Sequence, residues 1–178
     1  MKPEEIIEKY YAGQNELKLL LLKHSIQVAQ KAMEVLDKHP EIQADRRFVY
    51  EAAMLHDIGI LHTCAPGIGC IGTQPYICHG MLGAEILRKE GLPLHARVAE
   101  RHTGTGLTKE TILRQALPLP PNDFTPETIE EQIICYADKF FSKTRLDSED
   151  SYERVEKKMQ KWGDESVEQL RRWREMFE

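Results

Sequence analysis

Long hydrophobic runs are missing from this 178-residue sequence, in which stretches such as Leu19–Leu22 are short pieces of helix core. A membrane-spanning helix needs about 20 apolar residues, so none is expected. The first residues, Met1 to Glu5, also lack the basic and apolar regions of a signal peptide. We therefore expect a soluble, cytoplasmic protein with no membrane partner.

A surplus of positive charge is also absent, because 24 Lys and Arg residues stand against 29 Asp and Glu residues and give a net charge of -5. The basic residues are scattered, whereas a protein that binds a nucleic-acid backbone concentrates them. A nucleic-acid polymer is therefore not an expected partner.

Repeats, low-complexity tracts and nucleophile motifs are lacking too. The 41% hydrophobic content suffices for one ordinary core.

Cysteine is scarce and occurs only at Cys64, Cys70, Cys78 and Cys135. The spacings of six and eight residues between the first three differ from the paired short knuckles of a structural zinc site. A disulfide is equally disfavoured in a reducing cytosol. We expect free thiols along a loop, with Cys135 in the core.

The sequence does contain an ordered set of side chains that bind metals: His24, the pair His56-Asp57, His79, His102 and Asp138. Imidazole and carboxylate groups together suit a divalent metal ion. A lone histidine in a helix is more often a core or surface residue, so the interpretation depends on where each one lies.

Helical periodicity places these side chains on buried faces. His24 lies four residues from both Leu20 and Val28, within an apolar stripe. The same step of four from an apolar neighbour recurs in the set: His56 follows Ala52, Asp138 follows Ile134, and His102 follows Val98, which itself follows Leu94 by four. We therefore expect several helices to bury one shared polar site.

Burying so many ionisable groups without partners would cost several kcal/mol for each group. A shared metal centre satisfies all of them at once. A buried hydrogen-bond network of His and Asp is the alternative, and it is disfavoured because so many helices converge on the same set.

The order His, His-Asp, His, His, Asp resembles the HD superfamily of metal-dependent phosphohydrolases over about residues 15 to 145. The string Leu55–Gly59 reads as its HDIG variant. Three further strings resemble small stand-alone HDIG proteins of unassigned substrate: His79–Glu85, Glu100–Gly106 and Tyr136–Lys139. A more distant resemblance is to the bacterial dinucleoside tetraphosphatases.

One branch of the superfamily is disfavoured. HD-GYP cyclic-dinucleotide phosphodiesterases often have Lys where this chain has Ile60, and the GYP signature is absent after His102. Thr103 stands where some relatives have a second histidine, so the number of ligands at a second metal site stays open.

The resemblance and the helical periodicity together predict an all-α fold, a single-domain HD-type helical bundle with a C-terminal helical extension. The HD domain is expected at residues 1–147 and the extension at 148–178, packed on the domain or on a second subunit, which leaves a homodimer open. Helices are expected at about 3–11, 15–38, 45–56, 79–91, 94–102 and 109–117, and from Thr125 onward.

Residues 60–76 are rich in Gly and Pro and are expected to form a long loop. Because such loops are uncommon unless functional, a wall or lid of the site is favoured over a flexible connector. Gly83, one turn after His79, is expected to leave space for metal or substrate.

The resemblance implies one or two divalent metal ions (Mn, Fe, Co, Ni, Mg or Zn) that share Asp57. Their expected ligands are His24, His56, Asp57 and Asp138 for the first ion, and Asp57, His79 and His102 for the second.

A metal-activated water would then attack phosphorus, which suits a chain without a nucleophile motif. Besides Asp57, the catalytic candidates are Lys139 and Arg101, each next to a ligand and able to neutralise phosphate. They are equally expected as surface ion pairs. His62 is a candidate acid or substrate contact, although a solvated loop residue is the favoured interpretation.

The expected function is metal-dependent hydrolysis of a small phosphate ester or anhydride, with a nucleotide as the favoured substrate. Two alternatives remain: a di-iron oxygenase on the same scaffold and a non-catalytic nucleotide sensor. A mixed-valence iron signal would favour the first, and tight ligand binding without turnover would favour the second.

Overall fold

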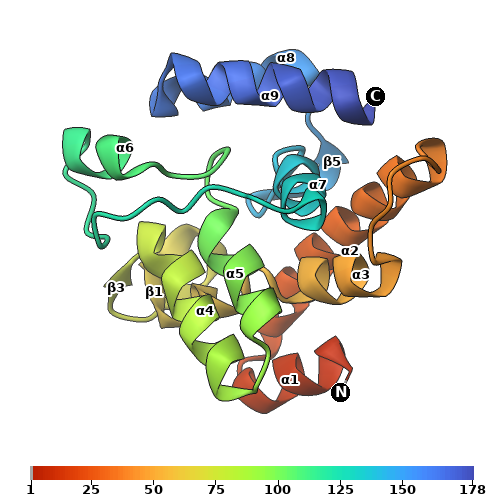
Figure 1. The fold of residues 1–178 in the computed structure, drawn as a ribbon. Helices are drawn as coiled ribbons and strands as arrows, with labels where there is room; N and C mark the ends of the chain where they lie inside the picture. Colours follow the sequence, from red (N-terminus) through yellow and green to blue (C-terminus); the bar gives the residue numbers. More distant parts are fainter. Residues whose placement is uncertain (1) are drawn as a thin grey trace.

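The computed structural model describes residues 2–178, and within them the chain is predominantly helical (Figure 1). The predicted all-α class is confirmed. The α-helices of the described chain are α1 (Pro3–Tyr10), α2 (Asn15–Lys38), α3 (Arg46–Leu55), α4 (His79–Lys89), α5 (Pro93–Arg101), α6 (Lys109–Arg114), α7 (Ile129–Asp138), α8 (Tyr152–Met159) and α9 (Asp164–Phe177). None of them is long and apolar enough to cross a membrane.

Local sequence explains where several helices begin and end. The carboxylate of Asp45 accepts a hydrogen bond from the backbone N–H of Phe48 and caps α3. α7 begins later than the predicted Thr125, because Thr128 and Glu131 form a reciprocal capping box. α6 ends before the predicted Leu117, and Ala116 follows it with a left-handed φ of 47°.

Two small sheets were not predicted. The first has the strand order β2-β1-β3, with β1 (Thr63–Ala65) antiparallel to β2 (Cys70–Ile71) and parallel to β3 (Gln74–Pro75). The second is the antiparallel pair β4 (Phe141–Ser142) and β5 (Arg145–Glu149). Strands this short show no readable alternation of polar and apolar residues. The segment 60–76 was expected to be a loop, but pairing of three short strands holds it in place.

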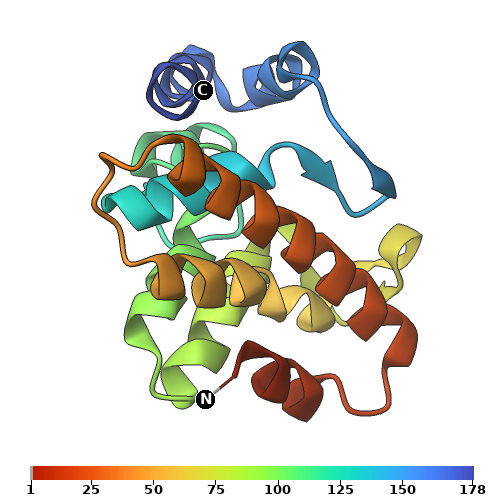
Figure 2. The ribbon, with the colours of Figure 1, turned by 90° about the vertical axis from the view of Figure 1, so that its right-hand side faces the viewer.

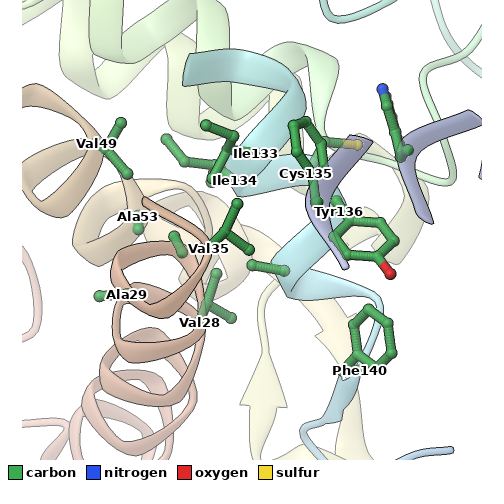
Figure 3. Packing of buried hydrophobic residues seen from close by; sticks show 14 of the residues in the cluster. Val28, Ala29, Val35, Val49, Ala53, Ile133, Ile134, Cys135, Tyr136 and Phe140 are labelled. Carbon is green, nitrogen blue, oxygen red and sulfur yellow. The ribbon is translucent and has the colours of Figure 1, made fainter. Parts of the chain in front are cut away.

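The C-terminal helices share the core of the domain. Side chains of α8 and α9, including Val155, Leu170 and Trp173, belong to the same buried cluster as Val28 and Tyr136. Figure 3 shows part of this cluster, where α2, α3 and α7 meet. In both ribbon views α8 and α9 lie at the end of the molecule opposite α1 (Figure 1, Figure 2). The domain boundary at residue 147 stays a prediction.

Glycines allow the helices near the predicted metal ligands to approach closely. A Cβ on Gly59 would lie 2.2 Å from the carbonyl oxygen of His79, and one on Gly80 would lie 2.5 Å from that of Ala99. A Cβ on Gly83 would face the backbone nitrogen of Gly59 at 3.2 Å. Gly83 therefore makes room for the neighbouring backbone, whereas space for metal or substrate was predicted.

Candidate metal centre

Most of the predicted ligands lie where helices end. His24 is the exception, in the middle of α2. The others occupy the following positions: His56 directly after α3, Asp57 directly before the short 3-10 helix η1 (Ile58–His62), His79 at the start of α4, His102 directly after α5, and Asp138 at the end of α7. Leu94, expected to face inward with His102, is 61% exposed at the start of α5.

The structure brings the first group of side chains together around two carboxylate oxygens. His24 Nε2 lies 3.1 Å from Asp57 Oδ2 and 3.0 Å from Asp138 Oδ1. His56 Nε2 lies 3.2 Å and 3.4 Å from the same two oxygens. One ligand atom from each of the four residues lies within 4.8 Å of all the others, and His24, His56 and Asp57 are fully buried. This group could hold a metal ion.

The second group uses the other oxygen of Asp57. The Nε2 atoms of His79 and His102 each lie 3.4 Å from Asp57 Oδ1 and 3.0 Å from each other. Asp57 thus belongs to both groups, with one carboxylate oxygen facing each. Asp57 could therefore contribute to both sites if two metal ions were bound.

Backbone carbonyls orient three of the histidines. Each ring donates from Nδ1 to the carbonyl three residues earlier, at 2.7 Å: His56 to Ala53, His79 to Tyr76, and His102 to Ala99. Because a carbonyl only accepts, Nδ1 carries a proton in each ring and Nε2 faces the cluster. Metal-binding histidines are typically fixed in this way.

The cluster contains buried polar atoms that lack hydrogen-bond partners. Within residues 2–178 these include Nε2 of His24, Nε2 of His56 and Oδ1 of Asp57, the carboxylate oxygen that faces away from Lys143. Buried polar groups are nearly always satisfied, and a bound ion is one of the accepted reasons for exceptions. A divalent cation would accept these lone pairs, so the residues present fit a metal ion.

The pKa values of the cluster suit metal binding. Burial alone would raise the pKa of Asp57, but Lys143 and His56 outweigh it and hold that pKa well below its usual value. Burial lowers the pKa of His79 to about 3 and also lowers that of His102. Burial lowers the pKa of His56 as well, but the carboxylates of Asp57 and Asp138 outweigh it and raise that pKa to about 9. Metal binding would therefore displace a proton from His56.

Lys143 is a residue of the site that the sequence interpretation missed. Its ammonium forms an ion pair with Asp57 Oδ2, and its side chain is only 12% exposed. Tyr76, which also interacts with Lys143 electrostatically, stacks on the ring of His79 with centroids 4.8 Å apart. Lys143 follows the short strand β4, so helical periodicity gave no signal for it. Its position five residues after Asp138 was the only available indication.

The other catalytic candidates have different surroundings. Lys139 Nζ donates to the carbonyl of His102 and to Asp138 Oδ2, each at 2.7 Å, and so ties the ends of α5 and α7 together. Arg101 turns away from the cluster and donates to the carbonyl of Thr125 and to Glu127. His62 is exposed at the end of η1. The structure does not bring Arg101 or His62 into the cluster.

The cysteines are free, as expected. Cys64 is exposed, Cys78 is half-buried, and Cys70 and Cys135 are buried. Cys135 donates its thiol proton to the carbonyl of His102 at 3.3 Å and thus lies in the core beside the site.

Comparison with known proteins finds relatives that match most of this chain. A tRNA (cytidine(56)-2'-O)-methyltransferase of Picrophilus torridus is 40% identical over 128 residues, which make up 71% of this chain but 33% of that protein. The chain thus spans about a third of that relative. The uncharacterized protein MJ0778 of Methanocaldococcus jannaschii is 35% identical over 145 residues, 79% of this chain and 78% of that protein.

Solved structures show the same fold. The HD domain of the L. monocytogenes phosphodiesterase PgpH superposes with a TM-score of 0.52 at 21% identity, covering 85% of this chain and 88% of that one. The same domain in complex with cyclic-di-AMP gives a TM-score of 0.53 at 20% identity, covering 85% and 86%. The family model described as HD domain matches residues 21–143, from just before His24 through Lys143. The chain therefore belongs to the HD domain family.

Proposed function

We propose that the chain is a metal-dependent hydrolase of a small phosphate ester or anhydride. The observation that carries the proposal is the position of Asp57 between two groups of histidine ligands, with one oxygen toward each. In this proposal His24, His56, Asp57 and Asp138 hold one divalent ion, and Asp57, His79 and His102 hold a second. Bound ions would lower the pKa of water and polarise phosphoryl oxygens.

The side chains around the cluster have supporting roles in this proposal. Lys143 supplies a cation beside Asp57 Oδ2, where it can neutralise a phosphate group. Lys139 is a positioning residue, because its bonds to Asp138 and to the carbonyl of His102 fix two of the ligand-bearing helix ends. Tyr76 fixes the ring of His79 in two ways. Its ring stacks on the imidazole, and its backbone carbonyl accepts a hydrogen bond from the Nδ1–H of His79.

A nucleotide is the proposed substrate class. The PgpH HD domain, which has the same fold, was solved in complex with cyclic-di-AMP, so that protein binds a nucleotide. The methyltransferase activity is not part of the proposal, because this chain spans about a third of the relative that bears that name. The site also consists of side chains suited to holding metal ions.

The test is a panel of nucleotides and small phosphate esters, each incubated with Mn, Co, Mg or Fe, with released phosphate and nucleotide products measured. We expect hydrolysis of at least one compound, and its loss in Asp57→Ala protein that remains folded. Tight nucleotide binding without any product would instead support the sensor alternative. A mixed-valence iron signal with oxygen consumption would support the oxygenase.

A further inference from the structure

A cavity opens beside the candidate metal centre. Its volume is about 560 Å³, within the range of roughly 300–1,000 Å³ that small-molecule sites occupy. Lys143, the cation paired with Asp57, lies in its wall, so the cavity adjoins the metal cluster. The rest of the wall comes from residues 65–76, the β4–β5 hairpin and the C-terminal extension.

All the charged side chains in this wall are positive. It contains Lys143, Lys158 and Lys161 and no Asp or Glu, although the chain as a whole has a net charge of -5. Lys158 and Lys161 belong to the C-terminal extension, on α8 and on the 3-10 helix that follows it. A wall with three cations and no carboxylate attracts anions.

The ion pairs around Lys158 leave positive charge uncompensated. Lys158 contacts Asp150, but Arg145 and Arg154 contact the same carboxylate. One negative charge therefore faces three positive ones. Asp150, shared in this way, does not fully neutralise Lys158, the one of the three cations that lines the cavity.

Lys161 has no ion-pair partner among residues 2–178, and its ammonium lies 4.7 Å from the ring centroid of Trp162. Its pKa is lowered by partial burial and then by the positive charges of Lys139 and Lys158. The smaller part of this lowering, which comes from Lys139 and Lys158, reflects a positive potential at this point. The position of Lys161 in the cavity wall and the positive charges around it both favour an anion at this point.

Resting on the proposed function, we infer that Lys158 and Lys161 bind a second anionic group of the substrate, beyond the phosphate that reacts at the metal cluster. The substrate is therefore a molecule with at least two phosphate groups, of the pyrophosphate or bisphosphate type. Tyr76 and Phe141 also line the cavity and add aromatic side chains to its wall.

The test is calorimetric titration of the full chain with methylenediphosphonate, a diphosphate analogue that is not hydrolysed, and with inorganic phosphate. We expect the wild-type protein to bind the diphosphonate at least about tenfold more tightly than phosphate. Lys161→Glu and the double variant Lys158→Ala/Lys161→Ala should lose most of this preference while phosphate affinity and metal content stay unchanged. Lys157→Ala, an exposed neighbour on α8, is the matched control and should keep it.

An unchanged preference in both variants, or a parallel loss of phosphate affinity, would overturn the inference, as would a wild-type protein without the preference. Lys161→Glu keeps the test valid if loss of the Lys158–Asp150 pair unfolds the double variant. Because the readout is equilibrium binding, a chain that binds the diphosphonate through these lysines but hydrolyses nothing would disprove the proposed function alone.

Discussion

At the scale of single residues, Asp57 is the side chain on which the proposed centre depends. Its two oxygens face different histidine pairs, His24 with His56 and His79 with His102. The loss of one carboxylate should therefore affect both metal positions, whereas the loss of one histidine should affect mainly its own.

We expect Asp57→Ala to abolish metal binding, while His79→Ala should lose mainly the second ion and retain roughly one ion per chain. Elemental analysis of purified protein measures this directly. His39→Ala, which removes a histidine outside the cluster, should leave the metal content unchanged. Equal and complete loss from Asp57→Ala and His79→Ala, with circular dichroism showing that both are folded, would contradict a bridging role.

Another residue with a defined electrostatic role is Asp150, whose side chain is 1% exposed and contacts Arg145, Arg154 and Lys158. Burial raises its pKa, but Lys158 and Arg145 outweigh burial and lower it. A lowered folded-state pKa stabilises the protein above the pH at which an unfolded Asp titrates, about 3.9, and the stabilisation is lost as the pH falls below that value.

Asp150→Asn should therefore lower the free energy of unfolding at pH 7 by about 1–2 kcal/mol. A value near the lower limit is expected, because the cations that contact Asp150 are partly exposed to solvent. The difference from wild type should shrink as the pH falls below about 4. Denaturant unfolding of both proteins from pH 7 down to pH 3 measures this. A difference that is constant with pH would show that ionisation of Asp150 is not its cause.

At the scale of elements, the close contact between η1 and α4 places Asp57 beside His79. A Cβ on Gly59 would lie 2.2 Å from the carbonyl oxygen of His79 and 2.3 Å from the backbone nitrogen of Gly83. Both neighbours are backbone atoms, which cannot rotate away as a side chain would. Any residue larger than glycine must therefore separate the two segments.

Gly59→Ala should cost about 1–3 kcal/mol of stability and reduce metal retention, since overpacking moves the backbone that carries the ligands. Thermal unfolding and elemental analysis measure the two effects. Gly67→Ala is a matched control, because a Cβ there would meet nothing within 4 Å. A stable, fully metal-loaded Gly59→Ala protein would contradict this account of the contact.

At the scale of the whole molecule, the C-terminal extension and the helices that carry the ligands share one hydrophobic core. Trp173 on α9 is 1% exposed, packs edge-on against Tyr136 of α7, and donates from its indole to Gln132. α7 in turn ends in Asp138. The extension should therefore unfold together with the site.

Trp173→Ala should lower the stability of the whole chain by about 3–5 kcal/mol through the cavity it leaves. Calorimetry should still show a single unfolding transition at a lower temperature. Met176→Ala on the same helix, where the side chain is 43% exposed, should have little effect. A separate early transition for the extension, with the remainder unchanged, would argue against a shared core.

The sequence by itself determined the helical class and the set of side chains that meet. Helical periodicity is local, so His24 could be placed on the buried stripe of α2 from its neighbours alone. Helix boundaries followed where Pro, Gly or a capping residue marks them, as at the start of α3. The role of these residues as metal ligands is our proposal.

Only the tertiary structure decided what depends on contacts between distant segments. The pairing of Lys143 with Asp57 depends on a hairpin too short to leave a periodic signal. Lys139, chosen for its position beside Asp138, donates to Asp138 and also to the carbonyl of His102, and the second contact depends on how α5 packs against α7. Gly59 and Gly83 owe their roles to backbone contact across the fold. Such contacts join residues that are far apart along the chain, so local patterns contain no information about them.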